Sequence, residues 1–122
     1  MVDFSKVRAI DFHTHAEESC GCHADDGYDE LQSTMAKYFG APWQHPPTIP
    51  ETAAHYREMN IAAVIFPVDA ERETGYRRYN NYEVAEACAK ESDILIPFAS
   101  IDPHKGKLGA REALDLVKNH GI

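Results

Sequence analysis

The strongest constraint on the fold is an alternation of apolar runs with amphipathic segments. Three runs, at residues 7–12, 61–68 and 94–101, are rich in Ile, Val, Ala and Phe. Strands covered on both faces carry such nearly continuous runs, whereas half-exposed strands alternate apolar with polar residues. Because a segment with helical periodicity follows each run, we predict parallel strands and helices in the order βαβαβα.

The segments after the runs also carry helix start and stop signals. Thr48 and Glu51 have the spacing of a capping box, Asn80 is a favourable N-cap, and Gly121 is a natural residue for a helix end. The apolar stripes predicted for the three helices are Ala53/Tyr56/Met59, Tyr82/Ala85/Ala89 and Ala110/Ala113/Leu114/Val117. Each stripe is expected to face the sheet.

Polar side chains follow all three apolar runs. His13 and His15 come after the first run, Asp69 after the second, and Asp102 and His104 after the third. TIM barrels carry their catalytic loops at these carboxyl ends of the strands. An open doubly wound sheet binds ligands at the same ends, but no Gly-rich phosphate loop follows any run here. The sequence therefore favours a barrel, with the open sheet as the alternative.

The first connection is much longer than the others. Residues 16–47 far exceed the roughly two to six residues of a usual βα loop. We predict an α/β fold that forms the first three βα units of a TIM (β/α)8 barrel over residues 1–122, with a lid-like insertion at about 16–47. Within the insertion, Trp43 either stacks on a ring substrate or seals the lid against the barrel rim.

The charge balance restricts the partners of the chain. The sequence has 12 Lys and Arg residues, 20 Asp and Glu residues and a formal net charge of −8. This acidity argues against nucleic acid or an anionic membrane as a partner. The chain has no secretory signal or membrane-spanning run, and its three cysteines suit a reducing compartment. We expect a cytoplasmic protein that acts on a small molecule, with homo-oligomerisation left open.

His13 and His15 are the leading candidates for metal ligands. In a strand their side chains point the same way, with Cα atoms roughly 6.5 to 7 Å apart, so both imidazoles can approach one zinc-like ion. Asp11 shares their parity and is predicted to accept an imidazole N–H behind the metal. The alternative is a strand end with two solvated histidines.

A second cluster, Cys20, Cys22 and His23, lies in the insertion. It raises the idea of a small zinc site, a redox pair or, less simply, a cysteine nucleophile with a histidine base. A C-x-C-H cluster without a second C-x-x-C is weak support for zinc. Cys88 stands at an apolar helix position and is predicted to be a small core residue.

Three segments together resemble a known family. D-F-H-T-H, I-F-P-V-D and I-P-F-A-S-I-D-P-H-K-G-K are similar to the N-terminal third of metal-dependent hydrolases of the amidohydrolase superfamily, in the branch called amidohydrolase 2. That branch includes aminocarboxymuconate semialdehyde decarboxylase, resorcylate decarboxylase, 4-oxalomesaconate hydratase and lactone hydrolases. The resemblance implies a distorted TIM barrel that holds a divalent ion, usually zinc, with His13 and His15 as the first two ligands.

The family takes a further histidine and an aspartate base from later strands, which have no counterpart here. The chain stops at Gly121 and Ile122, where a fourth strand is expected to begin. The resemblance therefore predicts a truncated product or part of a longer protein. Non-catalytic alternatives are a fragment that self-associates through open sheet edges and a small doubly wound binding domain.

The implied reaction uses a metal-activated water on a small carbonyl substrate, such as a lactone, a β-keto acyl compound or an aromatic catabolic intermediate. Non-oxidative decarboxylation with the same ligands is the alternative. Trp43, Asp69 and Arg72 are the candidate substrate-binding residues. Arg72, with Arg77 and Arg78, could hold a carboxylate, but a solvated charged loop is the favoured explanation of these arginines.

Overall fold

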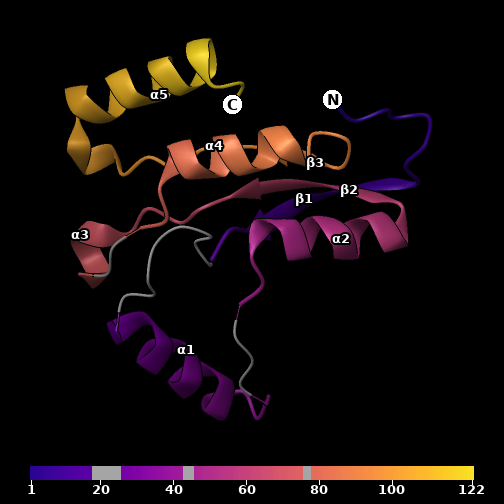
Figure 1. Ribbon diagram of the computed structural model, residues 1–122. Coiled ribbons are helices and arrows are strands. Elements are labelled where there is room, and N and C mark those ends of the chain that lie inside the picture. Colours follow the sequence, from indigo (N-terminus) through magenta and orange to yellow (C-terminus); the bar gives the residue numbers. More distant parts are fainter. Residues whose placement is uncertain (18–25, 43–45, 76–77) are drawn as a thin grey trace.

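The computed structural model describes residues 1–17, 26–42, 46–75 and 78–122. Its elements are β1 (Ala9–His15), α1 (Asp26–Tyr38), α2 (Ile49–Met59), β2 (Ile61–Phe66), α3 (Glu71–Thr74), α4 (Asn81–Lys90), β3 (Leu95–Pro97), the 3-10 helix η1 (Pro103–Lys105) and α5 (Lys107–Asn119). The strands form one parallel sheet in the order β1-β2-β3 (Figure 1). The predicted α/β class with a parallel sheet is therefore confirmed.

The helical layer lies on one face of the sheet. Helix α2 packs on β2, helix α4 packs on β3, and the two helices contact each other. A single core cluster combines Ala63 and Ile65 of β2 with residues from both helices and β3; these are Ile49, Ala53, Val84, Cys88 and Leu95. Sequential parallel strands joined by right-handed crossovers give this one-sided arrangement. Figure 1 shows α1 set apart from these layers.

The other face of the sheet carries large exposed apolar side chains. Phe12 is 68% exposed and Phe98 is 50% exposed. Strand β2 is buried on both faces, since Ala62 to Ile65 all have at most 2% of their surface exposed; the expectation of strands covered on both faces is therefore confirmed for β2 and is wrong at the two phenylalanines. Phe12 lies in the irregular part of β1, between Asp11 and Thr14, and Phe98 comes directly after the last residue of β3. Neither position is covered by α2 or α4.

The cap signals are confirmed at α2 and α4. The Glu51 carboxylate reaches back to accept the Thr48 backbone N–H at 2.8 Å and its hydroxyl at 2.7 Å. The Asn80 side chain accepts the Tyr82 backbone N–H at 2.9 Å. Helix α2 ends at Asn60, whose φ of 54° is left-handed, a conformation that asparagine tolerates better than most residues. Local polar residues thus fix both helix starts.

Two predicted strands have different bounds in the structure. The first begins at Ala9, where pairing with Ile61 begins, and continues through His15. The third covers only Leu95–Pro97 instead of 94–101. Its partner β2 ends at Phe66, and a strand without a neighbour has no ladder to extend. The chain beyond Pro97 instead turns toward η1.

The predicted apolar stripe of α5 is wrong. Leu114 is 55% exposed and Val117 is 61% exposed, whereas the buried positions are Gly109 and Leu116. The side with Gly109 and Leu116 faces inward because Glu112, on the same side, accepts partly buried hydrogen bonds from Asn81 of α4 and from Arg78 in the loop before it. Because a charged residue lies on the buried side of α5, the spacing of apolar residues does not identify that side.

Helix α4 departs from its predicted stripe by one position. Ala89 is exposed, and the buried side includes Val84, Ala85 and Cys88. The predicted core role of Cys88 is confirmed, since its side chain has no exposed surface. Burial raises the pKa of the Cys88 thiol to about 12, so the thiol stays protonated and unreactive at neutral pH.

Gly109 is the position where α5 approaches the β3–η1 connection most closely. A Cβ atom there would lie 2.7 Å from Ile101 Cγ2 and 3.2 Å from Lys105 Cβ. Overpacking costs about 1–3 kcal/mol, whereas the better helix propensity of alanine returns about 1 kcal/mol. We expect Gly109→Ala to lower the free energy of unfolding by about 1 kcal/mol, measured by urea denaturation.

Ile101→Ala provides the control, because it removes the methyl group that the new Cβ would meet. In that background Gly109→Ala should be neutral or stabilising, as helix propensity alone then decides the sign. Stabilisation by Gly109→Ala in the native background would contradict the close approach.

Candidate metal centre

An irregularity in β1 determines which side chains face the helices. Asp11 pairs with Ala63 and Thr14 pairs with Ile65, so one extra residue of β1 is accommodated between these pairs. Ala63 and Ile65 both belong to the core beneath the helices. Asp11 and Thr14 therefore face the helical layer together, which a regular strand would not allow.

Tyr56 of α2 connects both of these side chains. Its hydroxyl donates to Asp11 Oδ2 at 2.7 Å and lies 2.8 Å from Thr14 Oγ1. Asp11 Oδ1 accepts the backbone N–H of His13 at 2.9 Å. The His13 N–H and the Tyr56 hydroxyl together lower the pKa of Asp11, which keeps it an acceptor.

These contacts correct the role predicted for Asp11. The carboxylate does not share a face with the histidines, because the irregularity reverses its parity relative to theirs. It holds the backbone of His13 instead of an imidazole ring. Tyr56 anchors this arrangement from the helical layer, a contact between segments 45 residues apart that strand periodicity alone does not reveal.

The two histidines themselves converge as predicted. Their Nε2 atoms lie 3.1 Å apart and their ring centroids 4.9 Å apart. Phe66, the β2 residue paired with His15, meets both rings edge-on, with centroids 5.4 Å from His13 and 5.1 Å from His15. The aromatic ring therefore supports the two imidazoles from the neighbouring strand.

This separation fits a shared metal ion. Zn–N bonds of about 2.0–2.1 Å at angles between square and tetrahedral place two ligand nitrogens roughly 2.9–3.4 Å apart. The observed 3.1 Å lies within that range. Neutral imidazoles also hydrogen-bond at this distance, with one ring donating and the other accepting. The separation is therefore compatible both with ligation of one ion and with a hydrogen bond between the two rings.

Glu17 is a carboxylate that the sequence reasoning missed. Its Oε1 lies 3.7 Å from His15 Nδ1, the ring nitrogen opposite the one that faces His13. A negative charge there favours a proton on Nδ1 and leaves Nε2 as the ligand nitrogen. Its position two residues after His15 is a usable signal, because residues i and i+2 of an extended chain point to the same side. Over the described ranges, however, no group of three or more His, Cys, Asp or Glu side chains is arranged to hold one metal ion.

Asp69 lies at the centre of a buried charge network. Its side chain has no exposed surface. Oδ2 accepts from Lys105 Nζ at 2.7 Å, from the Asp102 backbone N–H at 2.9 Å and from Arg78 Nη1 at 3.1 Å. Burial raises the pKa of Asp69, but these three donors outweigh it and the net pKa is lowered. Oδ1 is buried without a partner in the described part of the chain.

Arg78 extends the network to α5. Its Nη2 donates to Glu112 at 2.7 Å, and Asn81 donates to the same carboxylate at 2.9 Å. The Arg78 side chain is only 15% exposed, so the solvated-loop interpretation does not apply to it. The Asp69–Arg78–Glu112 network therefore connects the segment after β2 to α4 and α5. In this structure Asp69 and Arg78 thus hold the fold together.

Asp102 and His104 form a second local pair. Asp102 Oδ1 accepts the His104 backbone N–H and faces its Nδ1, both at 2.8 Å. Asp102 thereby caps η1, as its position before Pro103 suggests. The two backbone and side-chain contacts with His104 lower the pKa of Asp102. The structure therefore gives Asp102 the role of N-cap for η1.

The other predicted site residues have mixed placements. Arg72 lies exposed on α3, beyond the carboxyl end of β2. Trp43, Arg77 and the C-x-C-H cluster fall outside the described residues, as do parts of the predicted insertion. Helix α1 forms within that insertion.

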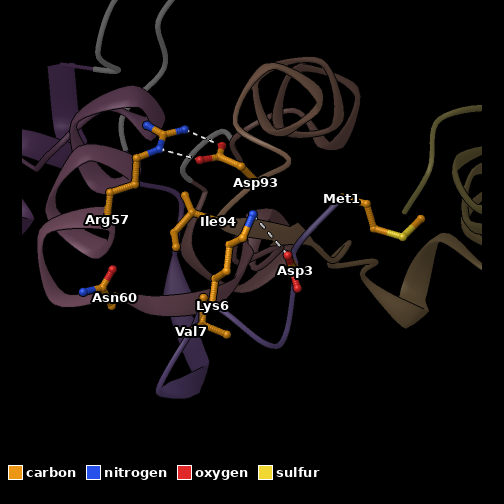
Figure 2. Close-up of a pocket in the computed structure, with 8 residues that line it drawn as sticks. All are labelled: Met1, Asp3, Lys6, Val7, Arg57, Asn60, Asp93 and Ile94. Carbon is orange, nitrogen blue, oxygen red and sulfur yellow. Dashed lines mark hydrogen bonds and ion pairs between the residues drawn. The ribbon is translucent and has the colours of Figure 1, made fainter.

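A hollow of about 430 Å³ lies at the opposite end of the sheet, where the strands begin (Figure 2). Arg57 makes a two-pronged contact with Asp93 at 2.6 and 2.8 Å, and Lys6 lies 3.3 Å from Asp3. The two basic side chains that line the hollow, Arg57 and Lys6, are thus paired with carboxylates. The lining residues are Met1, Asp3, Lys6, Val7, Arg57, Asn60, Asp93 and Ile94. This end is remote from the histidine pair along β1.

Comparison of the chain with protein-family models, curated proteins and solved structures finds no match. Within the part of the chain that is described, no helix has the length and apolar character needed to span a bilayer. The case for function therefore depends on the geometry of the histidine pair.

Proposed function

We propose that the chain is part of a metal-dependent hydrolase, with His13 and His15 as ligands of a divalent cation, usually zinc. The supporting observation is the 3.1 Å separation of their Nε2 atoms on one side of the sheet. In this proposal the three βα units are the first three of a TIM barrel, and residues 16–47 provide its lid. The one-sided helical layer is compatible with such a barrel segment.

The roles of the chain's own residues follow from their contacts. When bound, a divalent cation supplies polarisation of a substrate carbonyl and acidification of water. Phe66 supports both imidazoles, Glu17 favours the Nδ1 proton of His15, and Tyr56 fixes the backbone of β1 through Asp11. These contacts hold the two ligand nitrogens in position before a cation arrives, which lowers the cost of binding.

Substrate recognition is assigned to the exposed residues at the carboxyl ends of the strands. Arg72 is placed on α3 to meet a carboxylate, and Trp43 remains the candidate for ring stacking. The exposed Phe12 and Phe98 give the same side an apolar character. A small carbonyl compound with an anionic group, such as a lactone or a β-keto acid, suits this combination.

The proposal is tested by preparing the protein metal-free and adding zinc back. Hydrolysis of a panel of lactones and β-keto acids should appear with zinc and disappear with chelator, while His13→Ala should stay inactive at every zinc concentration. His55→Ala, which removes an exposed histidine on α2, is the matched control and should retain activity. Release of carbon dioxide without hydrolysis would instead support the decarboxylase alternative. Zinc-independent activity would refute both.

A further inference from the structure

Three apolar residues of the stripe predicted for α5 lie on the outside of the fold. Ala110, Leu114 and Val117 have the i, i+4, i+7 spacing of one helix side, and all three are exposed. Helix α5 packs through its opposite side, which contains Gly109 and Leu116. Figure 1 shows α5 at the outside of the fold, beyond α4. This outer stripe (Ala110, Leu114 and Val117) is thus an amphipathic pattern that the described fold does not bury.

A row of cations runs beside the outer stripe. Lys107, Arg111 and Lys118 are exposed and, at about 100° per residue, lie within about 40° of one another around the helix axis. In the described part of the chain none of these three side chains forms an ion pair. By contrast, four basic residues elsewhere contact carboxylates: Lys6, Arg57, Arg78 and Lys105.

The acidic residues of α5 do not offset this basic row (Lys107, Arg111 and Lys118). Glu112 accepts from Arg78 on the inner side, and Asp115 accepts from the Tyr82 hydroxyl at 3.0 Å. Lys107 stands in the first turn, where the helix dipole favours an anion over a cation, and that turn carries no acidic residue. The outer side of α5 is therefore locally basic on a chain whose formal net charge is −8.

We propose that the outer side of α5 docks an acidic amphipathic helix of another polypeptide. Paired helices bury an apolar stripe flanked by charges, and opposite charges on the partner select it and set its register. The outer stripe contacts the apolar side of the partner, and the basic row pairs with its carboxylates. This surface is distinct from the histidine pair, so the inference does not depend on the proposed function.

An anionic bilayer is the other surface that a basic amphipathic helix can meet. The charge of the whole chain opposes that alternative, because a net charge of −8 is repelled by a negative surface, whereas a partner helix meets α5 alone. Helix α5 has 13 residues and is about 20 Å long, so the interface is small and of the transient class. The contact should therefore be weak and sensitive to salt.

Fluorescence anisotropy tests the proposal with a labelled peptide of three heptads that carries Leu at positions a and d and Glu at e and g. We expect binding at low salt that weakens at least tenfold at high salt. Arg111→Glu and Leu114→Ser should each weaken binding about tenfold. The matched controls are Lys90→Glu, at an exposed lysine of α4, and Leu108→Ser, at an exposed leucine about 120° around α5 from Leu114. Both should bind as the native chain does.

Three results would overturn the proposal. Equally tight binding of a peptide with Lys in place of Glu at e and g would show that apolar surface alone attracts the partner. Binding to vesicles that contain phosphatidylserine, without binding to the acidic peptide, would assign the outer side of α5 to a membrane. Equal affinities of Arg111→Glu and Lys90→Glu for the acidic peptide would place the contact elsewhere on the chain.

Discussion

Replacing His13 or His15 with alanine is expected to weaken zinc binding by more than about 100-fold, which exceeds the 10–100-fold loss typical of changes behind the ligands. Each histidine supplies one of the two Nε2 atoms that lie 3.1 Å apart. A single remaining imidazole on an exposed strand cannot hold a cation by itself. Competition with a chromophoric chelator at neutral pH measures the change.

Two further variants show whether the loss is specific. His55→Ala removes an exposed imidazole from α2 and should leave zinc affinity unchanged. Tyr56→Phe keeps both ligands but removes the hydroxyl that holds Asp11 and contacts Thr14. We expect it to weaken zinc binding roughly tenfold, at the lower limit for a supporting contact. Equal affinities in all of these variants would show that zinc binds elsewhere.

The histidine pair was predictable because its cause is local. Two residues separated by one position in a strand point the same way, and His13 and His15 satisfy this rule whether or not the preceding residues are regular. The same rule failed for Asp11, because the extra residue before Thr14 reverses parity within the strand. Irregular pairing depends on the partner strand and on Tyr56, which strand periodicity does not include.

The helices show the same division between local and distant causes. The starts of α2 and α4 were predictable from Thr48, Glu51 and Asn80, since caps act within one turn. The buried side of α5 was not, because it is selected by Glu112, whose partner Arg78 lies 34 residues away. Hydrophobicity identifies a buried face only where apolar contact, and not an ion pair, decides the orientation.

Arg78 and Arg57 provide a matched test of that ion-pair network. Each arginine contacts two carboxylates, but Arg78 is 15% exposed and its partner Asp69 has no exposed side-chain surface, whereas Arg57 is 39% exposed. Removing one member of a buried pair leaves charge without compensation and costs about 3–5 kcal/mol, while an exposed pair contributes about 0–1 kcal/mol.

We therefore expect Arg78→Ala to lower the free energy of unfolding by about 3 kcal/mol, since Asp69 and Glu112 each retain another donor. Arg57→Ala should cost less than about 1 kcal/mol, because Arg57 itself is 39% exposed and Asp93 is 62% exposed, so solvent screens their contact. Urea denaturation of both variants measures the difference.

Arg78→Lys distinguishes charge from geometry. The guanidinium reaches Asp69 through Nη1 and Glu112 through Nη2, whereas a lysine ammonium is a single point of charge. If the fork is what joins β2 to α5, lysine should recover less than half of the stability lost in Arg78→Ala. Full recovery by lysine would show that Arg78 acts through charge alone. The orientation of α5 would then have to depend on the close contact at Gly109.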